Sequence, residues 1–215
     1  MRWAVRTFPI TAFVLIVAVT TATLLQAVRQ WQTDEGRVAT IFLAGYLLWL
    51  FLELRITIRS AREDPRETDS GTVLVYGLSR VVVVLAAVLL PRSWATFEGW
   101  MALLLLPFAA GIVLRLWAIH SLGRFYSHKV RTVTGHRIVR TGPYRIVRHP
   151  AYAGMLLAHL AFVLFFLNNA SVAAYVVLLA PAVVIRILTE ERLLLATTDY
   201  ATYAARVRRL VPLVW

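Results

Sequence analysis

Residues with the chemistry of a binding site gather in one polar stretch, 135–154, of a chain that is otherwise mostly apolar. These 20 residues include four Arg, three Gly, two His, two Tyr and two Pro. Pro143 fixes its own φ and Pro150 restricts the residue before it to extended geometry, while glycines let the backbone approach a ligand closely. The stretch therefore predicts a constrained loop that folds around a small charged molecule.

Two tyrosines flank the basic run within this stretch. Tyr144 and Tyr152 are eight residues apart, on either side of 145–149, and their rings offer faces to a cation or a purine. Tyrosines also collect at membrane interfaces without binding a ligand. On residue types alone, both interpretations stay open.

The histidines are concentrated in the same part of the chain, at positions 120, 128, 136, 149 and 159. Steps of eight residues do not give the i,i+4 pair of a zincin, and no Asp or Glu occurs from 99 through 189 to supply a carboxylate ligand. The pattern disfavours a metal site. We expect His149 to contact a ligand and His159 to be a packed, hydrogen-bonded core residue.

A second group of chemically competent residues follows the last apolar run. Arg186 and Glu190 are four residues apart and share one helix face, whereas Glu191 points about 100° away. Glu190 suits a cationic or hydroxyl-rich ligand, and Arg186 suits a bidentate anion. The alternative is an exposed ion pair at a helix end, which contributes little. We favour a functional site because, with Asp199, these are the acids of the C-terminal half.

Three further ionisable residues, Glu53, Arg80 and Arg115, fall inside apolar runs. An ionisable residue inside a membrane is costly and needs a partner. Arg80 lies about 12 Å into its predicted helix. We predict a structural Glu53–Arg80 pair, and we expect Arg115, near the end of its run, to snorkel toward the interface.

The overall composition of the chain indicates that membrane-spanning helices position these residues. The chain is 60% hydrophobic with a mean hydropathy of +0.70, which predicts an all-α integral membrane protein. Its net charge of +12 is typical of membrane topology and attraction to anionic headgroups, and no motif indicates nucleic-acid binding. The absence of Cys excludes a disulfide, a thiolate metal site and a cysteine nucleophile.

Five to six membrane-spanning helices are predicted, in a single domain. The last two apolar runs are shorter than the roughly 20 residues of a straight span, so we predict a helical hairpin that turns at Asn168-Asn169. A signal peptide is the competing interpretation of the first run, but its length and the lack of an A-x-A-like exit favour a retained helix. The runs are Phe8–Val28, Val38–Leu54, Thr72–Leu90, Trp100–Ile119, Tyr152–Leu167 and Ser171–Ile185.

Basic residues are enriched in alternate loops. Under the positive-inside rule, this places both termini, loop 55–71 and region 115–151 in the cytoplasm and the Asn168-Asn169 turn outside. Loop 55–71 mixes both signs of charge and is interpreted as a solvated connector. Residues 200–212 are predicted to form an amphipathic surface helix that Pro212 ends.

Residues 115–215 resemble the isoprenylcysteine carboxyl methyltransferase family of small integral membrane enzymes. The R-H-P-x-Y-x-G element, followed by a hairpin and an E-E pair, is specific in combination, although residues 196–200 are shorter than the family's F-G-x-x-Y and lack both Phe and Gly. The resemblance rests on His136-Arg137-Ile138-Val139, Thr141-Gly142-Pro143-Tyr144, Arg148 through Gly154, Arg186 with Glu190-Glu191, Tyr200-x-x-Tyr203, Arg206-Val207 and Pro212.

The resemblance implies an S-adenosylmethionine-dependent methyltransferase with a cytosolic cofactor pocket and a lipophilic acceptor that arrives from the bilayer. Residues 1–114 then form a transmembrane scaffold, and 115–215 form the methyltransferase core with its cofactor loop and C-terminal helix. Arg186 corresponds to the substrate-facing arginine, and Arg186 and Glu190 are the candidate catalytic pair. The cofactor contacts carried over are His136, Arg137, Ile138, Val139, Tyr144, His149, Pro150, Ala151, Tyr152 and Glu190.

The residues themselves are compatible with this chemistry. A carboxylate acceptor would need no general base and Arg186 would orient it, whereas an amine, phenol or thiol would need a proton sink such as His149. Positioning and exclusion of water would then supply most of the catalysis. Membrane lipids are expected partners; the oligomeric state stays open. The alternatives are methylation of a phospholipid amine or small thiol, a sterol or enone reductase with a nicotinamide cofactor, and a non-enzymatic lipid-binding membrane protein.

Overall fold

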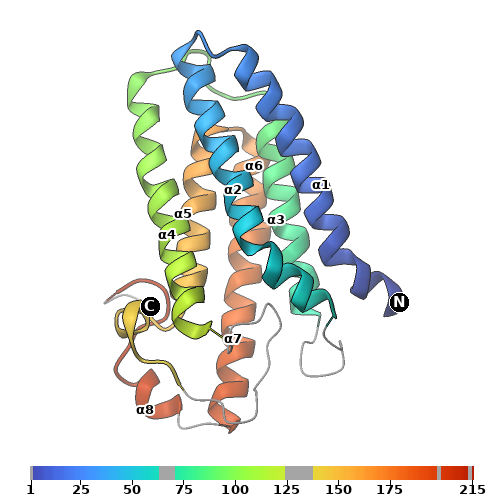
Figure 1. The fold of residues 1–215 in the computed structure, drawn as a ribbon. Coiled ribbons are helices and arrows are strands. Elements are labelled where there is room, and N and C mark those ends of the chain that lie inside the picture. The colour runs from blue at the N-terminus through green and yellow to red at the C-terminus, as the bar shows by residue number, and fades with distance from the viewer. Residues whose placement is uncertain (1, 63–70, 124–137, 198–199, 213–214) are drawn as a thin grey trace.

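The apolar runs form helices in the computed structural model, which describes residues 2–62, 71–123, 138–197, 200–212 and 215. The helices lie side by side along one direction (Figure 1). In chain order they are α1 (Arg2–Arg29), α2 (Asp34–Arg62), α3 (Thr72–Leu89), the 3₁₀ turn η1 (Gly99–Leu104) leading into α4 (Leu105–Leu122), the 3₁₀ turn η3 (Gly142–Arg145), α5 (Pro150–Phe165), α6 (Asn169–Ala173), the π-helical turn η4 (Ala174–Leu179), α7 (Ala180–Thr197) and α8 (Tyr200–Ala204).

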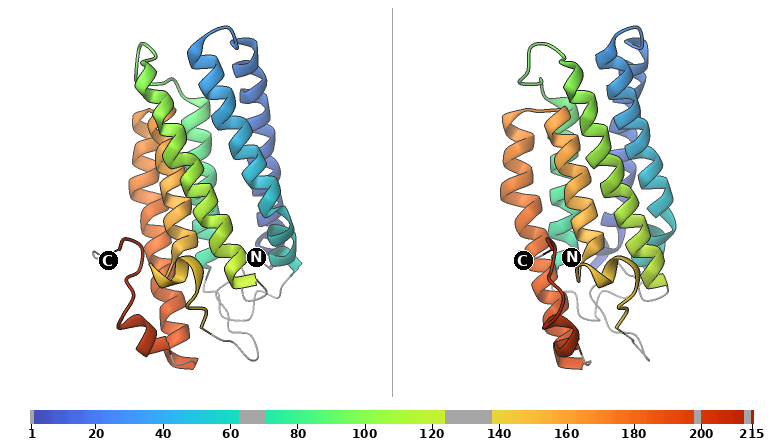
Figure 2. Two further views of the ribbon diagram at one scale, coloured as in Figure 1. Left: turned by 60° about the vertical axis from the view of Figure 1, so that its left-hand side comes forward. Right: turned by 90° about the vertical axis from the view of Figure 1, so that its left-hand side faces the viewer.

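Five of these helical stretches are long and apolar enough to cross a membrane, and Pro150–Phe165 is a shorter apolar helix. The all-α, multi-pass prediction is confirmed. The last predicted apolar run ends at residue 185, but the helix that contains it, Asn169–Ala196, continues well beyond that position. The lower part of this helix extends beyond the ends of the other helices (Figure 2). Residues 186–191 therefore lie on a continuous helix with the last apolar run.

Asn168 fixes the predicted hairpin turn. Its side chain accepts a hydrogen bond from the Ser171 backbone N–H at 2.8 Å, and the Ser171 hydroxyl lies 3.4 Å from the Asn168 backbone N–H, a reciprocal capping box. The Asn168 side-chain amide also donates to the Ala86 carbonyl at 3.0 Å, near the end of α3. The turn therefore lies at the end of the bundle opposite both chain termini (Figure 1).

Two glycines bring α4 and α5 into close contact. A Cβ added at Gly154 would lie 2.5 Å from the Gly111 carbonyl oxygen, and one added at Gly111 would lie 2.5 Å from the Gly154 carbonyl oxygen. Neither position accepts a larger residue unless the helices separate. Because α5 begins directly after the polar loop, this contact fixes the start of α5 against α4.

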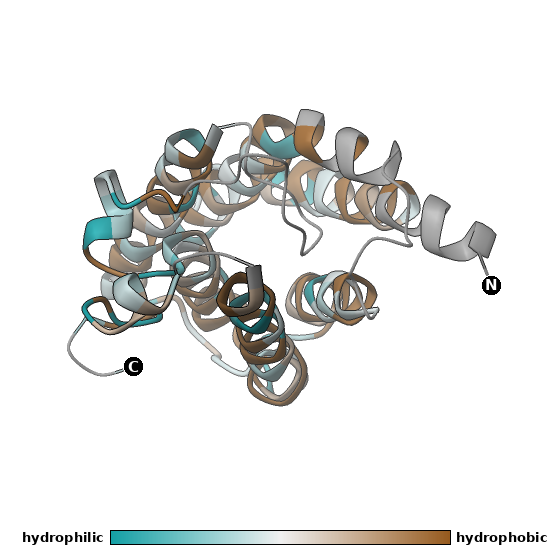
Figure 3. Ribbon diagram, turned by 90° about the horizontal axis from the view of Figure 1, so that it is seen from below, coloured by the Kyte–Doolittle hydropathy of each residue, from teal (hydrophilic) through white to brown (hydrophobic). Residues whose placement is uncertain are grey.

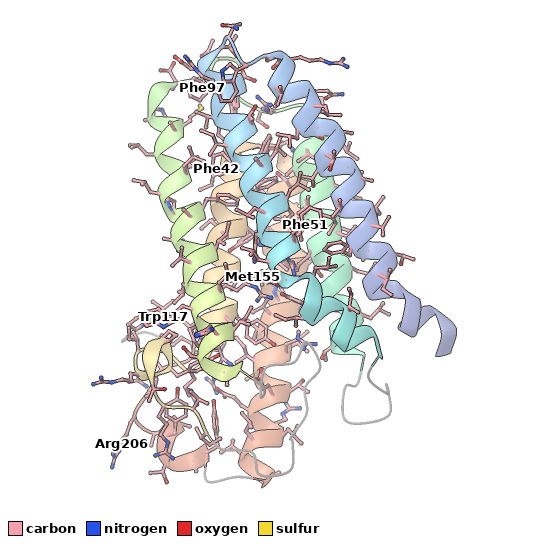
Figure 4. The ribbon with its side chains drawn as sticks, viewed as in Figure 1. Phe42, Phe51, Phe97, Trp117, Met155 and Arg206 are labelled. Carbon is pink, nitrogen blue, oxygen red and sulfur yellow. The ribbon has the colours of Figure 1, made fainter. Side chains whose placement is uncertain are left out.

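Aromatic side chains fill the core between the helices, where Phe42 lies (Figure 4). Phe42 of α2 stacks on Phe165 of α5 with ring centroids 4.6 Å apart, and it also packs against Phe108, Phe162 and Phe166. The outer faces are apolar and exposed, as a surface facing lipid requires; examples are Leu103, Leu106, Val113 and Val177. Seen from below, many hydrophilic residues gather near the C-terminus (Figure 3).

Candidate active site at the polar end of the bundle

The polar loop begins with a turn that its sequence requires. Gly142 has a φ of 59°, in the left-handed region that favours glycine. Pro143 follows in the first turn of η3, where its fixed φ is tolerated. Tyr144 is buried in this turn and packs with Ala151 at the start of α5. His136 and Arg137, two of the predicted cofactor contacts, lie outside the described residues.

The C-terminal segment pairs with the loop through its backbone. The backbone N–H groups of Arg148 and His149 donate to the carbonyls of Arg208 and Arg209 at 2.7 and 2.9 Å. These bonds draw the chain out of helical geometry, so α8 ends at Ala204. The prediction of a surface helix over 200–212 is therefore wrong for its second half.

Glu191 joins the loop, α7 and the C-terminal segment. Its carboxylate is buried and accepts hydrogen bonds from His149 Nε2 at 3.0 Å and Arg209 Nε at 2.9 Å, and Arg148 Nη1 lies 3.2 Å away. Sequence reasoning singled out Glu190 and missed this network. The signal available in the sequence was the high density of arginine around very few acids.

Two tyrosines of α8 complete this network. Tyr203 donates its hydroxyl to the Tyr144 carbonyl at 2.6 Å, and Tyr200 OH lies 3.5 Å from Glu191. Burial raises the pKa of Tyr203 to about 12, against the opposing effect of nearby arginines. Burial, with Glu191 adding to it, also raises the pKa of Tyr200. Both hydroxyls therefore stay protonated donors at neutral pH.

Glu190 lies beside this network and is more open to solvent. Its side chain is 36% exposed, and its Oε2 lies 4.0 Å from His149 Nδ1. The His149 ring is 6.0 Å from the ring of Tyr152, centroid to centroid. The structure thus gathers three of the predicted site residues, a carboxylate, an imidazole and a phenol, at the start of α5 and on the facing side of α7.

The remaining predicted cofactor residues fall into two small apolar clusters. Val139 packs with Tyr144 and Ala151, and Ile138 packs with Tyr203 near α8. Pro150, which the resemblance also carries over, is the first residue of α5 and is buried. Their roles toward a cofactor stay predictions.

Arg186 is buried one helical turn before Glu190. Its Nε donates to the Tyr152 hydroxyl at 3.2 Å and its Nη1 donates to the Thr72 hydroxyl at 3.1 Å. The guanidinium also lies 5.4 Å from the centroid of the Tyr76 ring. A cation is therefore held between α3, α5 and α7, on the membrane side of the carboxylate.

The buried ion pair within the bundle differs from the one predicted. Glu53 pairs with Arg115, whose Nε and Nη2 donate to its two carboxylate oxygens, the latter at 2.8 Å. Arg115 also donates to the Ala151 carbonyl, and it is buried, so it does not snorkel. The predicted Glu53–Arg80 pair is wrong because the fork of Arg115 matches the carboxylate in a bidentate pair. Arg80 instead lies over the Trp49 ring.

His159 is a core residue, as predicted. It is fully buried; its Nδ1 lies 2.9 Å from the Met155 carbonyl, and its Nε2 lies 3.3 Å from the Tyr46 hydroxyl. Because a carbonyl only accepts, Nδ1 carries the proton and Nε2 accepts from Tyr46. Within the described ranges, no group of three or more His, Asp or Glu side chains could hold a metal ion.

Fold and site together define a multi-pass helical membrane protein with a cluster of ionisable residues at the end of the bundle that carries α8. Residues 102–196 match the family model of the isoprenylcysteine carboxyl methyltransferase (ICMT) family. This region, somewhat less than half of the chain, is similar to that family, in agreement with the resemblance noted from the sequence.

Individual relatives agree with the family match. The uncharacterized protein YpbQ of Bacillus subtilis is 29% identical over 168 residues, which cover 69% of this chain and 96% of that protein. Protein-S-isoprenylcysteine O-methyltransferase B of Arabidopsis thaliana is 35% identical over 108 residues, 48% of this chain and 55% of the relative. The Saccharomyces cerevisiae protein-S-isoprenylcysteine O-methyltransferase is 31% identical over 104 residues, 46% and 44% of the two chains. The chain thus spans about half the length of the Arabidopsis thaliana and Saccharomyces cerevisiae methyltransferases that it matches.

Proposed function

We propose that this protein transfers a methyl group from S-adenosylmethionine to the carboxylate of a lipophilic acceptor of the isoprenylcysteine type. The observation that carries the proposal is the order of charges along one side of α7. Glu190 lies at the solvent-facing end, next to His149 and Tyr152, and Arg186 is buried one turn deeper. A carboxylate for a cationic donor and a guanidinium for an anionic acceptor are thus about 6 Å apart along the axis.

The residues present fit a sulfonium methyl donor. Glu190 is the partly exposed acid of this region, and it lies beside an imidazole and an aromatic ring, a setting that suits a cation with amino and hydroxyl donors. The residues that would hold the donor are those carried over by the family resemblance, Glu190, His149 and Tyr152 among them. When bound, S-adenosylmethionine supplies a methyl group already activated by positive sulfur.

Arg186 fits a carboxylate acceptor. It is held in place by hydrogen bonds to the hydroxyls of Tyr152 and Thr72. A carboxylate acceptor carries no proton, and no general base is required. The chain's contribution is then to orient the carboxylate, to hold the donor and to exclude water.

We propose that this end of the bundle faces the cytoplasm. Both chain termini and the second half of α7 lie toward the same end of the bundle (Figure 1), and the segments that the sequence assigns to this side, 55–71, 115–151 and 186–215, carry the excess of Lys and Arg. The positive-inside rule assigns such loops to the cytoplasm. An acceptor tail would then lie in the bilayer while its head group meets a cytosolic methyl donor.

Two measurements on the full chain in lipid nanodiscs test the proposal. Calorimetric titration is expected to detect binding of S-adenosylhomocysteine and no binding of NADPH, which a membrane reductase would prefer. Incubation with S-adenosylmethionine and N-acetyl-S-farnesylcysteine is expected to give the methyl ester, identified by mass spectrometry. Binding of NADPH in place of S-adenosylhomocysteine would refute the proposal.

A further inference from the structure

Unsatisfied polar atoms are concentrated at one place inside the bundle. Among the described residues, five buried side-chain nitrogen and oxygen atoms have no hydrogen-bond partner, and three of them belong to Tyr76 and Arg80. These are the Tyr76 hydroxyl and the Arg80 Nε and Nη2. The two side chains are neighbours, since the Arg80 guanidinium lies 5.8 Å from the Tyr76 ring centroid. Buried polar groups are normally satisfied, so this cluster requires an explanation.

Arg80 forms no ion pair within the described part of the chain, although the charge of Glu53 acts on it. It lies in the middle of α3, an apolar membrane span, where an uncompensated cation is costly. The acid nearest in depth, Glu53, already binds Arg115 with both carboxylate oxygens and accepts from Trp49. The other described acids lie at the two ends of the bundle: Asp34 and Glu35 pair with Arg37 and Arg92, Glu98 precedes η1, and Glu190 and Glu191 face His149.

Aromatic rings hold the Arg80 cation and the Tyr46 hydroxyl accepts a hydrogen bond from it, but Nε and Nη2 have no hydrogen-bond partner. The guanidinium lies 5.3 Å from the Trp49 ring centroid and also over Tyr76. Cation–π contacts attract the charge without satisfying N–H groups. Nε and Nη2 lie along one edge of the guanidinium, the edge that binds a carboxylate through two parallel hydrogen bonds. The missing partner therefore has the chemistry of a carboxylate.

This cluster adjoins the residues of the proposed active site. The Tyr76 ring that contacts Arg80 also contacts Arg186, at 5.4 Å from its centroid, and it packs edge-to-face on Tyr152 at 6.3 Å. Arg80, Tyr76 and Arg186 thus form a continuous series from the middle of α3 to the neighbourhood of Glu190. A ligand that reaches Arg80 is bound next to the acceptor site.

We propose that Arg80 and Tyr76 form an anion site within the membrane-spanning bundle that binds the carboxylate of an amphiphilic acceptor before this carboxylate moves to Arg186. The proposal rests on the proposed function and adds residues of the N-terminal half to the substrate site. Arg80 would bind the carboxylate through Nε and Nη2, and Tyr76 would donate a third hydrogen bond. Methyl esterification removes the negative charge, so the ester product loses this attraction and is released.

The test compares the acid with its neutral ester on the full chain in nanodiscs. N-acetyl-S-farnesylcysteine is expected to bind at least about tenfold more tightly than its methyl ester, as a bidentate charged contact implies. Arg80→Gln and Tyr76→Phe are expected to weaken acid binding, Arg80→Gln by about tenfold, and to leave ester binding unchanged. The control is Arg92→Gln, an arginine that also lies over an aromatic ring, Trp94, but pairs with Glu35 at the opposite end.

Thermal unfolding separates a binding role from a structural one. Because the Tyr76 hydroxyl and the two Arg80 nitrogens have no partner without ligand, Tyr76→Phe and Arg80→Gln are expected to leave the melting temperature unchanged or to raise it. A lower melting temperature, with equal losses of acid and ester affinity, would assign Arg80 a structural role and overturn the proposal.

The two proposals fail in different ways. Absence of S-adenosylhomocysteine binding would remove the methyltransferase function. Normal S-adenosylhomocysteine binding, combined with equal affinity for acid and ester, would remove the anion site alone. An acid affinity that is unchanged in both Arg80→Gln and Tyr76→Phe would have the same meaning, because the preference for the acid would then come from other residues, such as Arg186.

Discussion

Adjacent glutamates on α7 have very different surroundings. Glu191 is closed into a network with His149, Arg148 and Arg209, and it ties three segments together. Glu190, the preceding residue, is partly open and has His149 Nδ1 at 4.0 Å. One face of α7 thus uses its acid to hold the structure, and the other keeps its acid accessible. Two neighbouring residues of the same type can therefore have different roles, because the contacts made by each face of the helix determine what each residue does.

The largest effect is expected at the closed face. Glu191→Ala leaves three nearby basic side chains without their shared carboxylate, and breaking a buried pair in this way costs about 3 kcal/mol. Thermal unfolding in detergent measures the loss. The matched control is Glu190→Ala, which should change stability by no more than about 0.5 kcal/mol. Equal losses in both variants would contradict the distinction between the two faces.

Arg186 gives the next largest effect, on turnover. Arg186→Ala removes the buried cation that is proposed to orient the acceptor, and a loss of about a hundredfold in kcat is expected. S-adenosylhomocysteine affinity should stay close to that of the parent protein, as measured by calorimetry. A parallel collapse of S-adenosylhomocysteine binding would instead show that Arg186 supports the donor site.

Binding measurements with a methyl-donor analogue test the role of the open face of α7, which carries Glu190. Glu190→Ala and His149→Ala are each expected to weaken S-adenosylhomocysteine binding by about tenfold, the size of one charge-assisted hydrogen bond. Because His149 also binds Glu191, its substitution should lower the melting temperature, whereas Glu190→Ala should not. Unchanged affinity in both variants, measured by calorimetry, would refute the assignment of these residues to the donor site.

The smallest effect is expected at α8. Tyr203→Phe removes one hydrogen bond, from the Tyr203 hydroxyl to the Tyr144 carbonyl, and should cost about 1 kcal/mol. Burial raises the pKa of Tyr203 from 10.0 to about 12, so its protonated form is favoured in the fold. The contribution is therefore complete below pH 10.0 and is lost as pH rises toward about 12. The difference in unfolding between Tyr203→Phe and the parent protein should disappear over that range.

Local sequence signals were sufficient for the helices and the hairpin turn. Long apolar runs leave a helix as the form that satisfies the backbone in lipid, and Asn168 with Ser171 carries its own cap. Glycines in the polar loop predicted close approach of the backbone to a ligand, which stays a prediction; the structure shows that Gly154 lies against Gly111 of α4.

Partner choice across the bundle was not predictable in the same way. Glu53 lies at a depth that both Arg80 and Arg115 reach, and the sequence does not say which helix faces it. Likewise, residues 200–212 have a helical pattern, but the backbone bonds of Arg148 and His149 to Arg208 and Arg209 override it. These errors concern contacts between segments far apart in sequence, where tertiary structure outweighs local propensity.

The Gly111–Gly154 contact limits how a lipophilic acceptor can enter. With the two backbones this close, an isoprenoid chain has no room to slide between α4 and α5 at that level. A lipid chain therefore cannot enter the bundle from the bilayer between α4 and α5 at this level. The tail of the proposed acceptor would then have to enter between a different pair of helices.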